Sequence, residues 1–157
     1  MLKRVHPIAG LIGFLMILTF WTSTVGVELF GSRDMVVAVK QAIPWGFLIL
    51  VPALAITGAS GFRMAGASTD VLIARKKRRM PIIAGNGLFI LIPAALYLAI
   101  LASHGAFGTA FYIVQTVELT AGAVNLMLMS LNIRDGLNLT GRLSRHESAQ
   151  PVELGEK

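Results

Sequence analysis

Four long apolar stretches constrain this chain more than any other feature of its sequence. They cover residues 7–28, 42–62, 81–103 and 107–133. Each has about the 20 residues that a helix needs to cross a hydrocarbon core of about 30 Å. The sequence therefore predicts an all-α fold, an integral membrane four-helix bundle over residues 1–137, followed by a polar cytoplasmic tail over residues 138–157.

The positive charges are distributed unevenly around these stretches. Of the 14 Lys and Arg residues, only Arg33 and Lys40 lie between the first two stretches. The others precede the first stretch, separate the second from the third, or follow the fourth. By the positive-inside rule, both termini are expected in the cytoplasm, and the basic run 75–79 is expected to set this topology from a loop. The predicted location is a bacterial inner membrane.

The composition indicates that lipid is the solvent. Hydrophobic residues make up 55% of the chain and the mean hydropathy is +0.71, whereas soluble domains contain about 45–50% apolar residues. The net charge of +6 is expected to face anionic lipid head groups and not nucleic acid. Because the chain has no Cys, thiolate metal sites and cysteine nucleophiles are excluded. Partners could also include a second copy of the chain or a larger membrane complex.

One face of the fourth stretch is polar. Its polar members, with Gly122 and Met129 between them at spacings of three or four, are Gln115, Glu118, Asn125 and Asn132. Such spacings place side chains on one face of a helix. Because a lipid-facing carboxyl or amide would lack hydrogen-bond partners, this face is expected to point into the bundle.

Glu118 is the strongest candidate for function. A charge at the bilayer centre costs about 2.5–3.5 kcal/mol on insertion scales, so an intramembrane carboxylate is a functional hypothesis that requires a named partner. One interpretation is a proton or cation relay. The other is a structural hydrogen bond that joins the fourth helix to the first. In either case the expected partner is a polar group of the first or second helix, and Thr19, Thr22 and Ser23 are the favoured candidates.

The segment between the first two stretches is expected to be an external loop over residues 28–41. Glu28 and Lys40 are predicted to form an ion pair at its rim, and Trp21 and Trp45 to be interfacial anchors. Prolines are expected to open two helices, at Pro7 and Pro81, where the missing N–H costs nothing. Two more, at Pro52 and Pro93, are expected to bend their helices.

The histidines provide an alternative. His6 and Met80 are both expected at the cytoplasmic ends of helices, and a His/Met pair is a known axial ligand set for haem iron. This pairing makes haem b a candidate cofactor. The simpler interpretation is that His6 contacts head groups. His104 and His146 are not assigned a role, and no metal site is predicted.

Four segments carry a family resemblance: HPIAG (residues 6–10), STVGVELFG (23–31), AIPWG (42–46) and LNIRDG (131–136). They resemble segments of an uncharacterised family of small four-helix inner-membrane proteins of proteobacteria. That resemblance implies a fold and a location but no reaction. The initial His-Pro is also similar to the start of some b-type cytochrome helices, although their paired intramembrane histidines have no counterparts here.

Three classes of function are compatible with these features. The favoured class is a non-enzymatic membrane protein, which is either an accessory subunit or a module that moves a proton, a cation or a small solute along the polar stripe. The second is a haem-binding electron carrier. The third, a membrane enzyme acting on a lipid, lacks a Ser/His/Asp set, an acidic pair at metal-binding spacing and a glycine-rich phosphate loop. No catalytic residue is therefore assigned.

Overall fold

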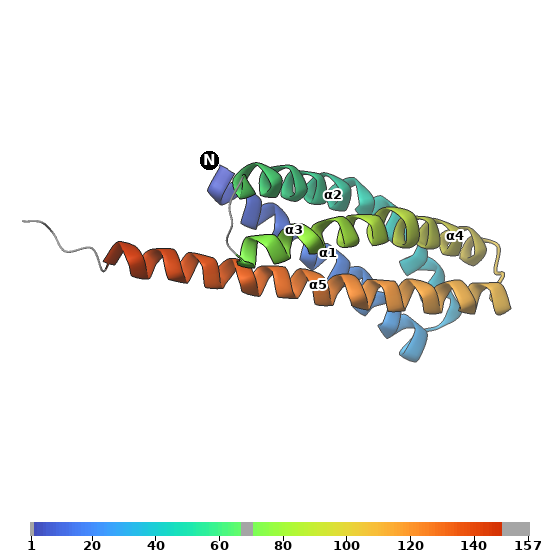
Figure 1. Cartoon of the computed structure of the whole chain (residues 1–157). Helices are drawn as coiled ribbons and strands as arrows, with labels where there is room; N and C mark the ends of the chain where they lie inside the picture. The colour runs from blue at the N-terminus through green and yellow to red at the C-terminus, as the bar shows by residue number, and fades with distance from the viewer. Residues whose placement is uncertain (1, 67–70, 149–157) are drawn as a thin grey trace, which may run out of the picture.

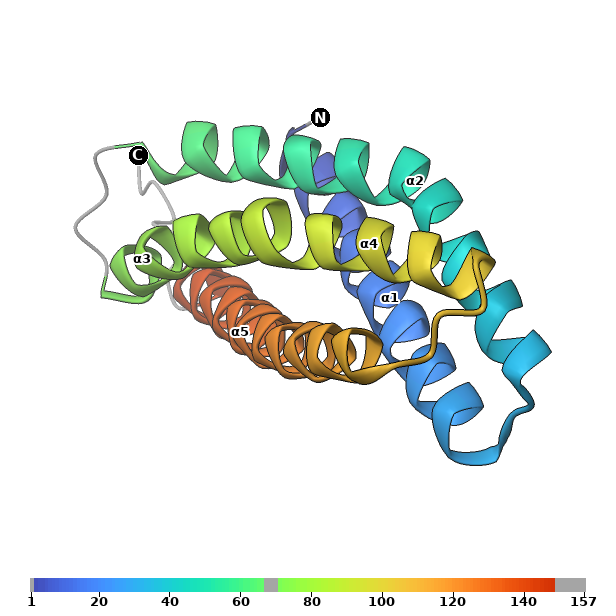
Figure 2. The same ribbon diagram turned by 90° about the vertical axis from the view of Figure 1, so that its right-hand side faces the viewer.

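The computed structural model describes residues 2–66 and 71–148, and all regular structure in this part of the chain is helical. The elements, in chain order, are α1 (Leu2–Phe30), α2 (Arg33–Ala65), α3 (Val71–Asn86), the π-helix η1 (Gly87–Leu91), α4 (Ile92–Ser103) and α5 (Thr109–Ser148). Because α3, η1 and α4 follow one another without a gap, they form one long rod. The result is a bundle of four long helical rods (Figures 1 and 2).

All four rods are long and apolar enough to cross a membrane. The membrane-length segments are Arg4–Phe30, Arg33–Met64, Val71–Ser103 and Thr109–Asn138. Many of their large apolar side chains face outward, including Leu48, Phe89 and Trp45, which are 71–75% exposed. Such a surface fits lipid better than water. The prediction of four membrane-length helices in an all-α fold is confirmed.

The helices extend further than the hydropathy pattern predicts. α1 begins before Pro7 and α3 before Pro81, so neither proline opens a helix. The basic run 75–79 therefore lies on α3 and not in a loop. α5 continues through residue 148, so the first part of the predicted polar tail is helical, while residues 149–157 lie outside the described part.

The expected external loop over residues 28–41 is much shorter in the structure. Only Gly31 and Ser32 separate α1 from α2. Ser32 is the N-cap of α2, since its side chain accepts a hydrogen bond from the Met35 backbone N–H at 3.4 Å. Consequently Glu28 and Lys40 both lie on helices.

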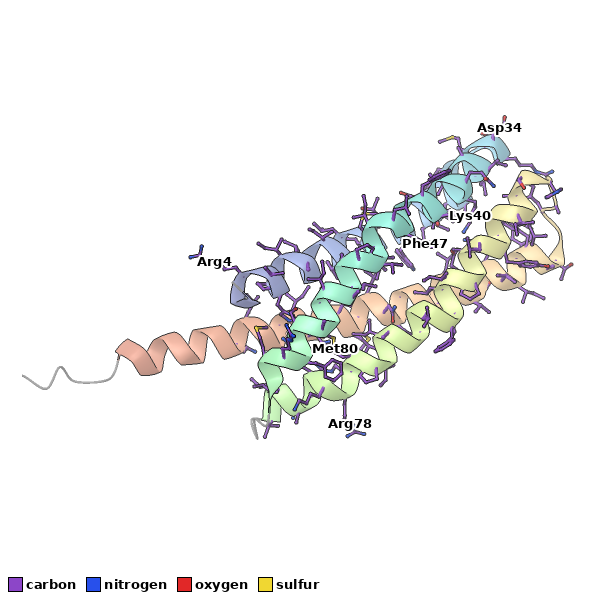
Figure 3. The ribbon with its side chains drawn as sticks, turned by 90° about the horizontal axis from the view of Figure 1, so that it is seen from above. Arg4, Asp34, Lys40, Phe47, Arg78 and Met80 are labelled. Carbon is purple, nitrogen blue, oxygen red and sulfur yellow. The ribbon has the colours of Figure 1, made fainter. Side chains whose placement is uncertain are left out.

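Charged side chains mark the two ends of the bundle. Arg4 and Arg78 lie near one end, called here the basic end, and Asp34 lies at the opposite end (Figure 3). Two groups of buried apolar side chains lie between them. The Phe111 cluster contains Val27, Val36, Leu98, Ala102 and Phe111, and the Met129 cluster contains Ile17, Leu50, Ile83 and Met129. Each cluster joins several rods.

The middle of the third rod is irregular. The π-helix η1 precedes Pro93, which stands at the start of α4. Because proline has no N–H, the helical ladder must lose a hydrogen bond here, and a π turn is one way in which a helix accommodates such a change. Pro52 lies inside α2.

Candidate functional site

An ion pair between Lys40 and Glu118 is the central feature of the site. Nζ of Lys40 donates to Oε2 of Glu118 at 2.5 Å. The Lys40 side chain is fully buried and that of Glu118 is 12% exposed. At 1.5 Å per residue, Lys40 lies roughly 10 Å from the start of α2 and Glu118 roughly 13 Å from the start of α5. The pair is therefore well inside the bundle, nearer to the Asp34 end than to the basic end.

The partner of Glu118 differs from the prediction. The hydroxyls of Thr19 and Thr22 donate to carbonyls of their own helix, at Leu15 and Leu18, and both threonines are exposed. Ser23 is partly buried on the same helix. The charged Lys40 of α2 reaches the carboxylate instead, so the expected partner on the first or second helix is present but is none of the three favoured residues.

The expected rim pair between Glu28 and Lys40 is also replaced. Lys40 is buried and bonded to Glu118, so it does not lie at a rim. Glu28, on α1, lies within electrostatic range of both Lys40 and Glu118. Its Oε1 atom is buried, and no hydrogen-bond partner for it exists among the described residues.

Gln115 lies one turn before Glu118 on α5 and is 4% exposed. Both its Oε1 and its Nε2 atoms are buried without a hydrogen-bond partner in the described part of the chain. An unmade hydrogen bond of a buried polar atom costs about 1–3 kcal/mol. We call the group formed by Lys40, Glu118, Glu28 and Gln115 the charged site. It combines an ion pair with buried polar atoms that have no hydrogen-bond partner among the described residues.

Apolar side chains close the charged site toward the Asp34 end. Val36 and Phe111 of the Phe111 cluster lie one turn before Lys40 on α2 and Gln115 on α5, whereas Val27 directly precedes Glu28 on α1. On the other side, Trp21 Nε1 donates to the Leu119 carbonyl at 2.9 Å and so joins α1 to α5. Trp21 therefore makes an interhelical contact, whereas Trp45 is exposed.

Two asparagines form a second polar layer, closer to the basic end. Asn86 Nδ2 donates to Asn125 Oδ1 at 2.8 Å and to the Ala121 carbonyl at 2.9 Å, and Asn125 Nδ2 lies 3.4 Å from the Ile83 carbonyl. Asn125 is fully buried. This layer joins the third rod to α5 beside the start of the π-helix.

A third polar layer lies at the basic end. Nη1 of Arg79 lies 2.7 Å from Oδ2 of Asp135 and 3.5 Å from Oδ1 of Asn132. Asp135 is 3% exposed. The polar face of α5 therefore continues beyond Asn132, and Gln115, Glu118, Asn125 and Asn132 all lie at buried or partly buried positions.

His6 and Met80 converge on the same glycine. Cε1 of His6 and Cε of Met80 lie 3.0 and 3.3 Å from the position that a Cβ at Gly61 would occupy. Nδ1 of His6 is 3.1 Å from the Thr57 carbonyl and 3.0 Å from the Ser60 hydroxyl. The predicted pair is thus brought together, with Nδ1 already engaged.

The other two histidines are remote from these layers. His104 is exposed at the end of α4, and its Nδ1 lies 2.8 Å from the Ile100 carbonyl. His146 is on the last turns of α5, and its side chain lies outside the described part of the structure. Among the described residues, no cluster of three or more His, Cys, Asp or Glu side chains could hold a metal ion.

Lys40 and Asp135 are the members of these layers that the sequence interpretation missed or underrated. Two local signals point to them. Ser32 followed by Asp34 is typical of a helix start and would have placed Lys40 on a helix. Asp135 follows Asn132 at a spacing of three, which continues the same polar face.

Comparison with known proteins identifies no relative: no family model, curated protein or solved structure matches the chain. The resemblance to small four-helix inner-membrane proteins therefore rests on the sequence segments alone. The class that the fold defines is a small helical protein with four helices of membrane-spanning length.

Proposed function

We propose that this chain is a multi-pass inner-membrane protein that moves positive charge, as protons or monovalent cations, along the polar face of α5. The observation that supports this most strongly is the buried Lys40–Glu118 ion pair beside the unpartnered atoms of Glu28 and Gln115. A purely structural site would be expected to satisfy all its buried polar atoms. Ionisable groups within membrane helices commonly mark ion or proton pathways.

The proposed orientation places both termini in the cytoplasm. Arg4 and Arg78 lie near the same end of the bundle, and Asp34 at the other (Figure 3). With the basic end in the cytoplasm, the excess of Lys and Arg follows the positive-inside rule. The charged site then lies in the outer half of the membrane, and the Arg79–Asp135 layer lies near the cytoplasmic head groups.

The ion pair provides a simple means by which a proton or another cation can replace the Lys40 ammonium at Glu118. While Glu118 is ionised, the ammonium of Lys40 neutralises it. When a proton binds the carboxylate, or when another cation takes the place of the ammonium, the attraction that holds Lys40 to Glu118 disappears. The Lys40 side chain is then free to interact with Glu28, which lies within range of its charge.

Flux measurements in proteoliposomes test this proposal. The wild-type protein should dissipate an imposed proton or alkali-cation gradient, and the double variant Lys40→Met/Glu118→Gln should reduce the rate at least tenfold. That variant removes both charges of the pair together, so neither partner of the pair is left buried without the other. Thr116→Val is the matched control, because Thr116 is exposed on the same helix and its hydroxyl donates to the Tyr112 carbonyl of that helix. Equal flux in all three proteins would leave an accessory structural subunit as the better explanation.

A haem-binding electron carrier remains the second candidate. The specific observation in its favour is that His6 uses Nδ1 for hydrogen bonding and approaches Met80, since metal-ligating histidines usually hold their second nitrogen in this way. The purified protein should then show a Soret band that falls on His6→Ala. A colourless preparation from haem-supplemented cells would eliminate this candidate.

A further inference from the structure

The charges of the site do not balance. Glu28 and Glu118 contribute two carboxylates, whereas Lys40 contributes one ammonium. Lys40 of α2 and Glu118 of α5 lie within electrostatic range of Glu28, while α4 brings the apolar Leu98, Leu101 and Ala102 to the cluster that contains Val27. With all three groups ionised, the charged site therefore carries one negative charge in excess in an environment where an unpaired charge is costly.

The unpartnered atoms are of the kind that a cation requires. Oε1 of Glu28 and Oε1 of Gln115 are both buried oxygen acceptors without a hydrogen-bond partner among the described residues. Hard cations prefer such oxygen ligands. Glu118 and Gln115 are one turn apart on α5, and Val27, directly before Glu28, belongs to the same packed cluster as Phe111, one turn before Gln115. The excess charge and the free oxygens thus belong to the same place.

We propose that Glu28 and Gln115 bind a single monovalent positive charge, a proton or an alkali cation, beside the Lys40–Glu118 pair. This inference rests on the proposed function and adds the site and the amount of charge bound. One positive charge neutralises the charged site, whereas a divalent ion would reverse its excess. The ammonium of Lys40 supplies the other positive charge of the charged site and is bonded to Glu118.

Thermal unfolding of the detergent-purified protein tests the binding. Sodium or potassium chloride is titrated at constant ionic strength against choline chloride, whose cation is too large for a buried site. In a second series the pH is varied in choline chloride alone. Saturable stabilisation by sodium or potassium identifies an alkali cation as the bound charge. Stabilisation on lowering the pH, without any alkali-cation effect, identifies a proton.

Two variants assign the effect to this site. Glu28→Gln should weaken the stabilising response at least tenfold in apparent affinity for an alkali cation, or abolish the pH response for a proton. Gln115→Leu keeps both carboxylates and should weaken alkali-cation binding by a similar factor, so the assignment does not depend on the folding of one variant. For a proton, Gln115→Leu should shift the midpoint of the pH response.

Asp34→Asn is the matched control, since it removes an exposed carboxylate at the same end of the bundle and should respond like the wild type. If neither alkali cations nor pH stabilises the wild-type protein relative to Glu28→Gln, the inference is overturned. The same holds if Asp34→Asn loses the response as fully as Glu28→Gln.

Binding and flux separate the two proposals. Saturable binding at Glu28 with no flux in proteoliposomes would leave this inference standing and remove the proposed transport function. Flux that depends on Lys40 and Glu118 but is unchanged in Glu28→Gln, with no binding response, would support transport and overturn the site inferred here.

Discussion

Asn86 and Asn125 join the third rod to α5 through their side-chain amides, with Nδ2 of Asn86 lying 2.8 Å from Oδ1 of Asn125. Each amide also bonds to a backbone carbonyl, at Ala121 and Ile83 respectively. In hydrocarbon, an amide without such partners would carry a large desolvation cost. The pair therefore explains how two buried asparagines are tolerated in apolar helices beside the π-helix.

Replacing both asparagines should cost less than the sum of the two single replacements. Asn86→Leu and Asn125→Leu should each lower the free energy of unfolding by roughly 1–3 kcal/mol, because the remaining amide is left buried without its partner. The double variant should lose less than the sum of the two single losses. Thermal unfolding in detergent measures this coupling. Ser130→Ala is the control, since the hydroxyl of exposed Ser130 donates to the Leu126 carbonyl of its own helix. Additive losses would mean that the amides do not act as a pair.

The losses of stability on replacing Lys40 and Glu118 should be non-additive in the same way, and the effect should be larger. Glu118→Gln leaves the fully buried ammonium of Lys40 unpaired, and loss of one partner of a buried ion pair costs about 3–5 kcal/mol in soluble proteins. Lys40→Met should be nearly as harmful, because two carboxylates then remain. The double variant Lys40→Met/Glu118→Gln should recover most of the lost stability in chemical or thermal unfolding. A double variant less stable than either single one would contradict the buried pair.

Gly122 and Gly58 should respond oppositely to alanine. A Cβ at Gly122 would lie 3.0 Å from Cδ1 of Trp21, whose ring is held by its bond to the Leu119 carbonyl, whereas nothing lies within 4 Å of a Cβ at Gly58. Gly122→Ala should therefore lower stability by about 1–3 kcal/mol through overpacking. Gly58→Ala should be neutral, or stabilising by about 0.5–1 kcal/mol, since alanine lowers the conformational entropy of the unfolded chain. Melting temperatures of the two variants provide the comparison.

Reporter fusions test the orientation. A reporter fused after Lys157 should be active as a cytoplasmic protein, and one inserted beside Asp34 as an external one, because the Lys and Arg residues are concentrated at the basic end. Paired alkaline phosphatase and fluorescent-protein fusions give opposite signals on the two sides. An external signal from the C-terminal fusion would require a different number of spans.

The number of helices and the inward polar face of α5 could be predicted from the sequence, because both are local properties. Hydropathy over about 20 residues identifies a membrane-length helix, and spacings of three and four place Gln115, Glu118, Asn125 and Asn132 on one face. The helix ends were less predictable. Charged residues lower the hydropathy of a window without ending the helix, so the extension of α2 past Lys40 and that of α3 past the basic run were missed.

The partners of the buried polar groups were decided only by the tertiary structure. Sequence alone determined that Glu118 lies within an apolar helix and requires a partner. Which side chain supplies it depends on the rotation and vertical register of α1 and α2 against α5, and these are set by packing among all the rods. That packing brings Lys40 and not Thr19, Thr22 or Ser23 to the carboxylate. It also leaves Glu28 and Gln115 with unused hydrogen-bonding atoms, because no helix in the described part of the chain brings a matching group to them.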